Sequence, residues 1–196
     1  MSRQLSQPVM NNLLAMLEHY ESLHDGKLIP NRLTPQMDAL GIWTEGYGQL
    51  VLDANGKQLK GYEDRSSALS NSKISTKEEA LTALGIRLGQ TVNALLDSTT
   101  GKLTDVQLAA VADLAYNIGI GGFETSTIYR LIQSNQIENI TRANFLSWNK
   151  GMLNGSLVSL DGLTARRASE WNMFFEGKLQ LYSCDKGILT PIEIQA

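Results

Sequence analysis

The sequence predicts an α+β fold that is mainly α-helical. Three observations lead to this prediction: a helical spacing of apolar residues near the N-terminus, one short region with hairpin signals, and a long series of helical segments from residue 76 onward. With 196 residues and a 42% hydrophobic composition, the chain is long enough to bury one compact core. We expect a small N-terminal lobe that contains the hairpin, and a helical C-terminal lobe.

The first element is expected to be an amphipathic helix that ends near Glu21. Pro8 suits a first helical turn, where a backbone N–H would have no partner. Apolar residues then recur with helical spacing, namely Val9, Leu13, Leu14, Leu17 and Tyr20. The stretch from Asp25 to Gln36 holds two prolines, a glycine and an asparagine, so it predicts a loop of about a dozen residues.

A hairpin is expected next. Residues 42–52 have the composition of an extended segment. The tetrapeptide Asp53-Ala54-Asn55-Gly56 is a turn signal, because Asn-Gly tolerates the positive φ angles of a hairpin turn. Residues 58–62 are then the returning strand. The polar, serine-rich residues 63–73 are interpreted as a linker or surface loop.

Two capping boxes mark the beginning of the longest predicted helices. Thr76 pairs with Glu79, and Thr104 pairs with Gln107. The first box opens a helix over residues 76–97 that connects the two lobes. The second opens a helix that is apolar on nearly every face and that Gly119 ends, as expected in the middle of a bundle.

Shorter helices complete the predicted C-terminal lobe. One is capped by Ser126 or Thr127, another includes residues 144–148, and the last runs from Thr164 to Phe175 with Gly177 as its stop. The predicted domain covers residues 1–177, with lobes at 10–75 and 103–177, and residues 178–196 form a tail that packs on it. Five aromatic residues are expected in the core: Trp43, Trp148, Trp171, Phe174 and Phe175.

The composition excludes several classes of function. A formal net charge of −3, a pI near 5.4 and the lack of any Lys/Arg block argue against nucleic-acid binding. Cys184 is the sole cysteine, and His19 and His24 are too few to suggest a metal centre, so we expect no disulfide, metal or organic cofactor. Polar residues interrupt the first apolar stretch, which predicts no signal peptide and no membrane-spanning segment.

The candidate chemistry lies between the first helix and the hairpin. Glu21 stands at the helix terminus, and Asp38 and Thr44 follow on or beside the Gly-rich segment 41–48. Two carboxyls that face one groove suit glycosidic hydrolysis, because one protonates the leaving oxygen while the other orders a water or stabilises the cationic sugar. We therefore predict a glycoside hydrolase site here.

Several motifs in consistent order carry a family resemblance. They are Tyr20-Glu21-Ser22-Leu23, Trp43-Thr44-Glu45-Gly46-Tyr47-Gly48, Asn117-Ile118-Gly119 and Gly162-Leu163-Thr164-Ala165-Arg166-Arg167. Over roughly residues 10 to 176 the chain resembles the phage-type lysozymes, the endolysin muramidases of glycoside hydrolase family 24. The resemblance implies a lysozyme-like fold with a cleft between its lobes. It also implies cleavage of the β-1,4 bond between N-acetylmuramic acid and N-acetylglucosamine in peptidoglycan, during phage-mediated lysis of the host.

The same resemblance assigns three catalytic roles. Glu21 is implied to be the general acid, Asp38 the carboxylate that works with the nucleophilic water, and Thr44 the hydroxyl that helps to hold that water. The implied reaction inverts the anomeric configuration, which asks for about 6.5–9.5 Å between the two carboxyls so that a water fits.

Four further residues receive supporting roles from the resemblance. Asn117, Tyr47 and Ser126 are implied to contact the substrate, and Arg166 is expected to support the site by pairing with Glu21. No nucleic acid or stable membrane insertion is expected, and the protein is expected to be monomeric. It would be made in the host cytoplasm and act on the periplasmic cell wall, either released with a holin or carried by the virion.

The chain departs from the family pattern at four places. Ser22 stands where glycine is usual, Gln49 where histidine is frequent, and Glu45 where an apolar residue follows the threonine. The gap between Glu21 and Asp38 is also longer than usual by about eight residues. This gap leaves open whether Asp38 or Glu45 is the second carboxylate. Because side chains alternate along a strand, we expect Glu45 behind Thr44 as a solvated or Arg-paired group.

Two alternatives to these interpretations stay open. Asp38 is also a suitable turn residue before Gly41, which requires no catalysis. The whole chain could likewise be a catalytically weak or inactive lysozyme-fold protein that binds glycan or serves as a virion component. Its acidic pI favours this second alternative slightly, because the cell-wall polymer is itself anionic.

Overall fold

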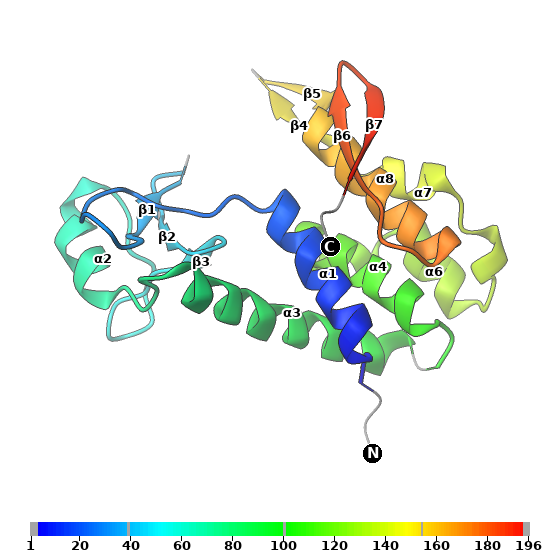
Figure 1. Ribbon diagram of the computed structural model, residues 1–196, viewed down its shortest axis with the longest axis horizontal. Helices are drawn as coiled ribbons and strands as arrows, with labels where there is room; N and C mark the ends of the chain where they lie inside the picture. Colours follow the sequence, from blue (N-terminus) through cyan, green and yellow to red (C-terminus); the bar gives the residue numbers. More distant parts are fainter. Residues whose placement is uncertain (1–3, 39, 100, 154, 194–196) are drawn as a thin grey trace. The chain divides into compact units, whose positions relative to one another are not determined.

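The computed structural model describes residues 4–38, 40–99, 101–153 and 155–193 (Figure 1). Within these residues, helices predominate and the strands form small antiparallel sheets ordered β1-β2-β3, β4-β5 and β6-β7. The predicted α+β, mainly helical fold is therefore confirmed. The elements are α1 (Gln7–Tyr20), β1 (Gln36–Met37), β2 (Trp43–Glu45), β3 (Gln49–Leu50), η1 (Tyr62–Asp64), α2 (Arg65–Asn71), α3 (Lys77–Thr99), α4 (Asp105–Ile118), α5 (Ile120–Glu124), α6 (Thr127–Gln133), η2 (Ile137–Asn139), α7 (Arg142–Leu146), β4 (Lys150–Leu153), β5 (Ser156–Ser159), α8 (Asp161–Glu176), β6 (Leu181–Asp185) and β7 (Ile188–Ile192).

The chain divides into two compact units. One comprises residues 21–87, and the other comprises residues 1–20 together with 88–196. We call them the sheet unit and the helical unit. Helix α1 belongs to the helical unit, whereas the residue that follows it, Glu21, belongs to the sheet unit. The second boundary falls inside α3, so this long helix contributes residues to both units.

The sheet unit is built around two successive turns. Residues 42–52 are not one extended strand as predicted, because the chain reverses at Gly46-Tyr47-Gly48 and Thr44 pairs with Leu50 across β2 and β3. Gly46 has a φ of 55°, and a Cβ there would lie 2.8 Å from Ile74 Cδ1. This position therefore requires glycine. The second turn is the predicted one, in which Gly56 N donates to Asp53 O at 3.0 Å.

Trp43 anchors the core of the sheet unit. Its side chain packs with Val51, Leu59 and Ala68, and its indole N–H donates to Gly61 O at 2.7 Å. Ala68 lies on α2, so the prediction of a loop over residues 63–73 is wrong. The serines there are compatible with a short helix, in which Ala68 is the buried residue. Burial against Trp43 thus overrides the polar composition.

The helical unit has α4 at its centre. Both predicted capping boxes are present: Glu79 N donates to Thr76 Oγ1 at 3.2 Å at the start of α3, and Thr104 pairs reciprocally with Gln107 at the start of α4. Every residue of α4 from 108 to 115 is buried, and Gly119 ends the helix as predicted. Helix α4 packs against α1 and α8.

Helix α8 begins at Asp161 rather than at the predicted Thr164. The Thr164 hydroxyl donates to Leu160 O at 3.0 Å, so it bonds within the first turn instead of capping the helix. Gly177 adopts a left-handed φ of 71° and stops the helix as predicted.

Phe175 is 68% exposed, so its expected burial in the core is wrong. It follows the buried Phe174 by one residue and therefore points about 100° away around the helix, where it stacks on Trp171.

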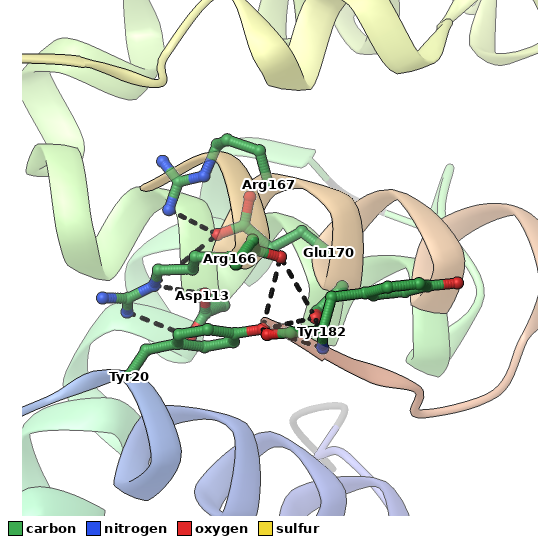
Figure 2. Close-up of polar contacts among 8 residues, drawn as sticks. Tyr20, Asp113, Arg166, Arg167, Glu170 and Tyr182 are labelled. Atoms are coloured by element: carbon green, nitrogen blue, oxygen red, sulfur yellow. Dashed lines mark hydrogen bonds and ion pairs between the residues drawn. The ribbon is translucent and has the colours of Figure 1, made fainter. Parts of the chain in front are cut away.

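The last described segment, β6 and β7, forms a hairpin whose first strand packs on α8 (Figure 1). The Tyr20 hydroxyl joins this hairpin to the rest of the unit, because it lies 2.6 Å from Ser169 Oγ and 2.9 Å from Tyr182 O (Figure 2). Tyr182 N also donates to Ser169 Oγ at 3.1 Å. One phenol thus connects α1, α8 and β6. Residues 194–196 of the predicted tail lie outside the described residues.

A buried group of charged side chains lies beside Tyr20 (Figure 2). Arg166 binds both carboxylate oxygens of Asp113, at 2.8 and 3.1 Å, and Arg167 Nη2 lies 2.6 Å from Glu170 Oε1. All four side chains are at most 3% exposed. Burial at this depth is unfavourable for any charge that lacks a partner.

The two acids of this group have opposite pKa shifts. Burial acts to raise the pKa of Asp113, but the charge of Arg166 and its hydrogen bonds outweigh burial and lower that pKa. Burial dominates at Glu170 and raises its pKa well above the usual range, although the charge of Arg167 acts in the other direction. Glu170 Oε1 lies 2.6 Å from Arg167 Nη2 and 3.8 Å from Arg166 Nε, whereas Glu170 Oε2 is buried without a hydrogen-bond partner among the described residues.

Glu170→Gln should become more stable than the wild type as the pH rises. A carboxyl with a raised folded pKa stabilises fully below its unfolded pKa and loses that contribution as the pH rises through the folded value. Glutamine keeps the neutral form at every pH. The Tm difference between variant and wild type should therefore grow from near zero as the pH increases above about 4.5, the ordinary pKa of glutamate.

The measurement is thermal unfolding between pH 4 and pH 8, with Glu176→Gln as the control. Glu176 is exposed on the same helix, so its replacement should give a difference that does not grow with pH. A Glu170→Gln difference that shrinks with rising pH would show that Glu170 is ionised in the folded protein.

Glu45 is a buried structural group and not the solvated or Arg-paired carboxylate that the alternation of side chains predicts. It is 2% exposed, and its Oε2 accepts hydrogen bonds from Ser72 Oγ at 2.8 Å, Lys73 N at 2.9 Å and Ile74 N at 3.1 Å. The carboxylate accepts hydrogen bonds from backbone N–H groups in the segment that leads into α3. This is why a charged residue replaces an apolar one at this position.

Glu45→Ala should destabilise the protein by about 1–3 kcal/mol, because the buried N–H of Ile74 and the part-buried N–H of Lys73 lose their acceptor. Glu63→Ala is the control, since Glu63 is an exposed acid in the same unit. Urea unfolding followed by tryptophan fluorescence measures both. Equal stability of the two variants would mean that the three hydrogen bonds of Glu45 contribute nothing net.

Candidate active site

The predicted site residues belong to both units. Glu21, Asp38, Thr44 and Tyr47 lie in the sheet unit, whereas Asn117, Ser126 and Arg166 lie in the helical unit. The three residues predicted to do the chemistry are therefore carried by one compact unit. Hydrogen bonds within the sheet unit hold together the segments that carry these three residues.

Glu21 is the first residue after α1 and is half-buried. Three residues later the chain joins the sheet unit's hairpin, because His24 N donates to Gly46 O at 2.7 Å in an antiparallel bridge. The segment that carries Glu21 is thus fixed close to the turn after β2. This bridge accounts for the helix end: the chain leaves the helical path to pair with a strand.

Asp38 follows β1 directly and closes a tight turn. Its N–H donates to Ile42 O at 2.8 Å, and its Oδ1 accepts hydrogen bonds from Leu40 N at 2.8 Å and Ile42 N at 2.9 Å. The turn role that the sequence offered as an alternative is therefore present. Both bonds use Oδ1, and no described residue donates to Oδ2 in addition. One oxygen holds the turn, and the other is available to a ligand or water.

Thr44 lies in the middle of β2, between β1 and β3, and is 4% exposed. Its hydroxyl oxygen lies 2.6 Å from His24 Nδ1 and 3.1 Å from Gln36 O. Gln36 precedes Asp38 by two residues, and His24 follows Glu21 by three. The Thr44 hydroxyl therefore links the segments that carry the other two candidate catalytic residues.

Sequence reasoning missed His24. We weighed the two histidines only as metal ligands, and a histidine three residues after a candidate acid carries no recognisable signal by itself. The contact arises from the bridge between residue 24 and residue 46, which no local pattern reveals. Among the described residues, no cluster of three or more His, Cys, Asp or Glu side chains is arranged to hold a metal ion.

The predicted substrate contacts differ in exposure. Asn117 is exposed near the end of α4, which leaves its amide accessible to a ligand. Ser126 is 3% exposed, and its hydroxyl accepts Tyr129 N at 3.0 Å as the cap of α6, as predicted for that helix. Tyr47 belongs to the sheet unit and is 5% exposed. For these three residues, contact with a substrate stays a prediction.

Arg166 is committed to a buried partner. Its bidentate bond to Asp113 uses two of the five guanidinium N–H groups, and its guanidinium carbon lies 6.0 Å from the centre of the Tyr20 ring. Arg166 therefore lies beside the residue that precedes Glu21 in the chain. The expected pairing of Arg166 with Glu21 itself stays a prediction.

Two open pockets lie in the sheet unit. One of about 650 Å³ lies next to the Asp38 turn, between Met37, Gly41 and the charged residues Lys57, Lys60, Glu63 and Asp64. The other, of about 540 Å³, is lined by the long loop from Asp25 to Leu33 and by residues 75–77 at the start of α3. The additional loop length that distinguishes this chain thus shapes one wall of a surface pocket.

A family model described as phage lysozyme matches residues 30–170. The matched range includes Asp38 and Thr44 and begins after Glu21. No helix within the described residues is both long enough and apolar enough to cross a bilayer. The family resemblance inferred from the motifs is confirmed at the level of phage lysozymes.

Individual proteins agree with the family model. An endolysin of Acyrthosiphon pisum secondary endosymbiont phage 1 is 27% identical over 161 residues, which cover 82% of this chain and 93% of that protein. The endolysin from Escherichia coli O157:H7 phage FAHEc1 has a similar structure, with a TM-score of 0.66 and 24% identity over 91% of this chain and 98% of its own. The muramidase domain of SpmX from Asticaccaulis excentricus gives a TM-score of 0.61 at 21% identity, over 88% and 98% of the two chains. These structures confirm the lysozyme-like fold, and because the family model spans well over half of the sequence, this chain belongs to the phage lysozyme family.

Proposed function

We propose that this protein is a muramidase that hydrolyses peptidoglycan glycan strands at the β-1,4 bond between N-acetylmuramic acid and N-acetylglucosamine. Membership of the phage lysozyme family supports the activity. The observation that carries the site assignment is the arrangement around Thr44, whose hydroxyl bonds the strand leading to Asp38 and the segment leading from Glu21. This arrangement gathers an acid, a carboxylate with one open oxygen and a hydroxyl within one unit.

The three residues divide the chemistry as follows. Glu21, as general acid, gives its proton to the glycosidic oxygen as the bond to the anomeric carbon breaks. A water attacks the opposite face of the sugar and transfers a proton to Asp38, while Thr44 holds that water. The sugar therefore leaves with inverted configuration, and solvent restores the proton to Glu21 and removes it from Asp38.

Glu45 is a poorer candidate for the second carboxylate than Asp38. All three described hydrogen bonds to Glu45 come from residues 72–74, and its side chain is almost completely buried. A general base needs contact with the attacking water, which Asp38 can offer through Oδ2. We therefore assign the water-activating role to Asp38.

The remaining roles concern binding and delivery. Asn117, Tyr47 and Ser126 are proposed to contact the glycan, and Arg166 to pair with Glu21. The protein is proposed to act as a monomer on the periplasmic cell wall after holin-dependent release or from a virion, with no role for nucleic acid. The endolysins among its relatives support an action on the cell wall.

Glu21→Gln should abolish the clearing of outer-membrane-permeabilised Gram-negative cells while the protein stays folded. Glutamine keeps the shape of the side chain but cannot donate the proton, so a loss of about two orders of magnitude or more is expected. The turbidity assay measures the rate, and Glu18→Gln, one turn earlier in α1, is the control. Full activity of Glu21→Gln would remove the acid assignment, and an inactive wild type would favour a glycan-binding role without turnover.

Asp38→Asn should lower kcat by two or more orders of magnitude with little change in stability, because the amide still accepts the two turn hydrogen bonds but cannot take a proton. The wild-type reaction should release the α-anomer first. Proton NMR of a soluble glycan digest, recorded before mutarotation, detects it. A first-formed β-anomer would show a retaining mechanism and would remove the water-holding roles of Asp38 and Thr44.

A further inference from the structure

The Thr44 hydroxyl has a limited capacity for hydrogen bonds. A hydroxyl carries one proton to donate and two lone pairs that accept. Gln36 O is a carbonyl oxygen and can only accept, so the 3.1 Å contact uses the Thr44 proton. His24 Nδ1, at 2.6 Å, must then be the donor if both contacts are made together. The carbonyl thus fixes which ring nitrogen of His24 carries hydrogen.

We infer that His24 is a positioning residue of this site, whose Nδ1–H orients the Thr44 hydroxyl so that it can only accept a hydrogen bond from the nucleophilic water. This inference rests on the proposed function, because it assigns the water to Thr44. The proton of Thr44 is held by Gln36 O and one lone pair by His24. The second lone pair is what remains for a water.

The orientation of the Thr44 hydroxyl restricts the orientation of a water bound to it. Because Thr44 can only accept, a bound water must donate one O–H to Thr44. It can donate the other O–H to Asp38 Oδ2. Its lone pairs then face away from both residues, toward the substrate. When the new bond to the anomeric carbon forms, the O–H facing Asp38 gives up its proton, and the O–H facing Thr44 stays in the product hydroxyl. A freely rotating threonine could instead donate to the water and occupy the lone pair needed for attack.

Hydrogen bonds anchor the backbone around His24. His24 N bonds to Gly46 O, two residues beyond Thr44. On the other side, the Asp25 carboxylate accepts Lys27 N at 2.9 Å and lies 3.3 Å from both Thr34 N and Thr34 Oγ1. His24 is therefore anchored at its own amide and at the next residue, and it is partly buried. A side chain supported in this way loses little freedom on forming its contact.

The other histidine provides a matched control. His19 is exposed on α1 in the helical unit, and its ring meets the Tyr20 ring edge-on at 4.7 Å between centroids. It makes no described contact with Thr44. Replacing either histidine removes one imidazole from the chain, but only His24 bonds the threonine.

The first experiment compares His24→Leu, His24→Asn and His19→Leu in single-turnover and steady-state assays on a soluble peptidoglycan oligosaccharide. The asparagine amide N–H stands at the same number of bonds from Cα as Nδ1–H, so it can replace the donor, whereas leucine cannot. His24→Leu should lower kcat about ten- to a hundredfold with KM within about twofold. His24→Asn should recover most of that loss, and His19→Leu should match the wild type.

A double-mutant cycle then tests whether His24 acts through Thr44. In the Thr44→Val background, His24→Leu should change kcat by less than about twofold, because the hydroxyl it orients is already absent. Independent, multiplicative losses would overturn the inference, as would wild-type kcat in His24→Leu. A wild type with no turnover at all would refute the proposed function instead, which separates the two failures.

The third measurement does not depend on activity. The ¹⁵N chemical shifts of imidazole distinguish a protonated from an unprotonated ring nitrogen. In the wild type at pH 8, His24 should carry hydrogen on Nδ1, and Thr44→Val should release this preference while His19 is unaffected. A His24 ring with hydrogen on Nε2 alone would mean that Thr44 donates to His24, and the inference would fail.

Discussion

The hydroxyl of Thr44 is the contact on which the arrangement of the candidate site depends. It lies on the central strand of a three-stranded sheet and reaches Gln36 on one neighbour and His24 on the incoming chain. Because Thr44 pairs with both Gln36 and Leu50, a shift of one residue in either register would turn the hydroxyl to the opposite face. The positions of the segments that carry Glu21 and Asp38 thus follow from the register of very short strands, supported by the core around Trp43.

The helical unit contains a group of buried charged side chains. Asp113 and Arg166 bury opposite charges with bidentate geometry, and burial raises the pKa of the neighbouring Glu170 carboxyl well above its usual range. Arg166 is thereby held rigidly beside Tyr20, the last residue of α1. The polar contacts of the Tyr20 hydroxyl extend the same group to the C-terminal hairpin. The segment beyond the family match therefore contributes to the support of the helix that leads to Glu21.

The features that could be predicted from the sequence are those that neighbouring residues determine. The two capping boxes, the stops at Gly119 and Gly177 and the turn at Gly56 each depend on neighbouring residues, and all are present. The family motifs placed the candidate catalytic residues, but their contacts were beyond the reach of the sequence. The helix at residues 65–71 depends on Ala68 meeting Trp43, and the burial of Glu45 depends on backbone N–H groups almost thirty residues away. Such features come from tertiary contacts that no spacing rule contains.

The long gap between Glu21 and Asp38 illustrates how a fold absorbs additional sequence in a loop that closes on itself. Gly26 N donates to Thr34 O at 3.0 Å, and Leu28 N donates to Thr34 Oγ1 at 3.1 Å, so the loop closes on itself at its base. Closing a longer loop costs little additional free energy, since the entropy grows only with the logarithm of length. Beyond Thr34 the chain re-enters β1 at Gln36 in register with Thr44. The extra residues therefore line a pocket wall, while the chain returns to the sheet two residues before Asp38.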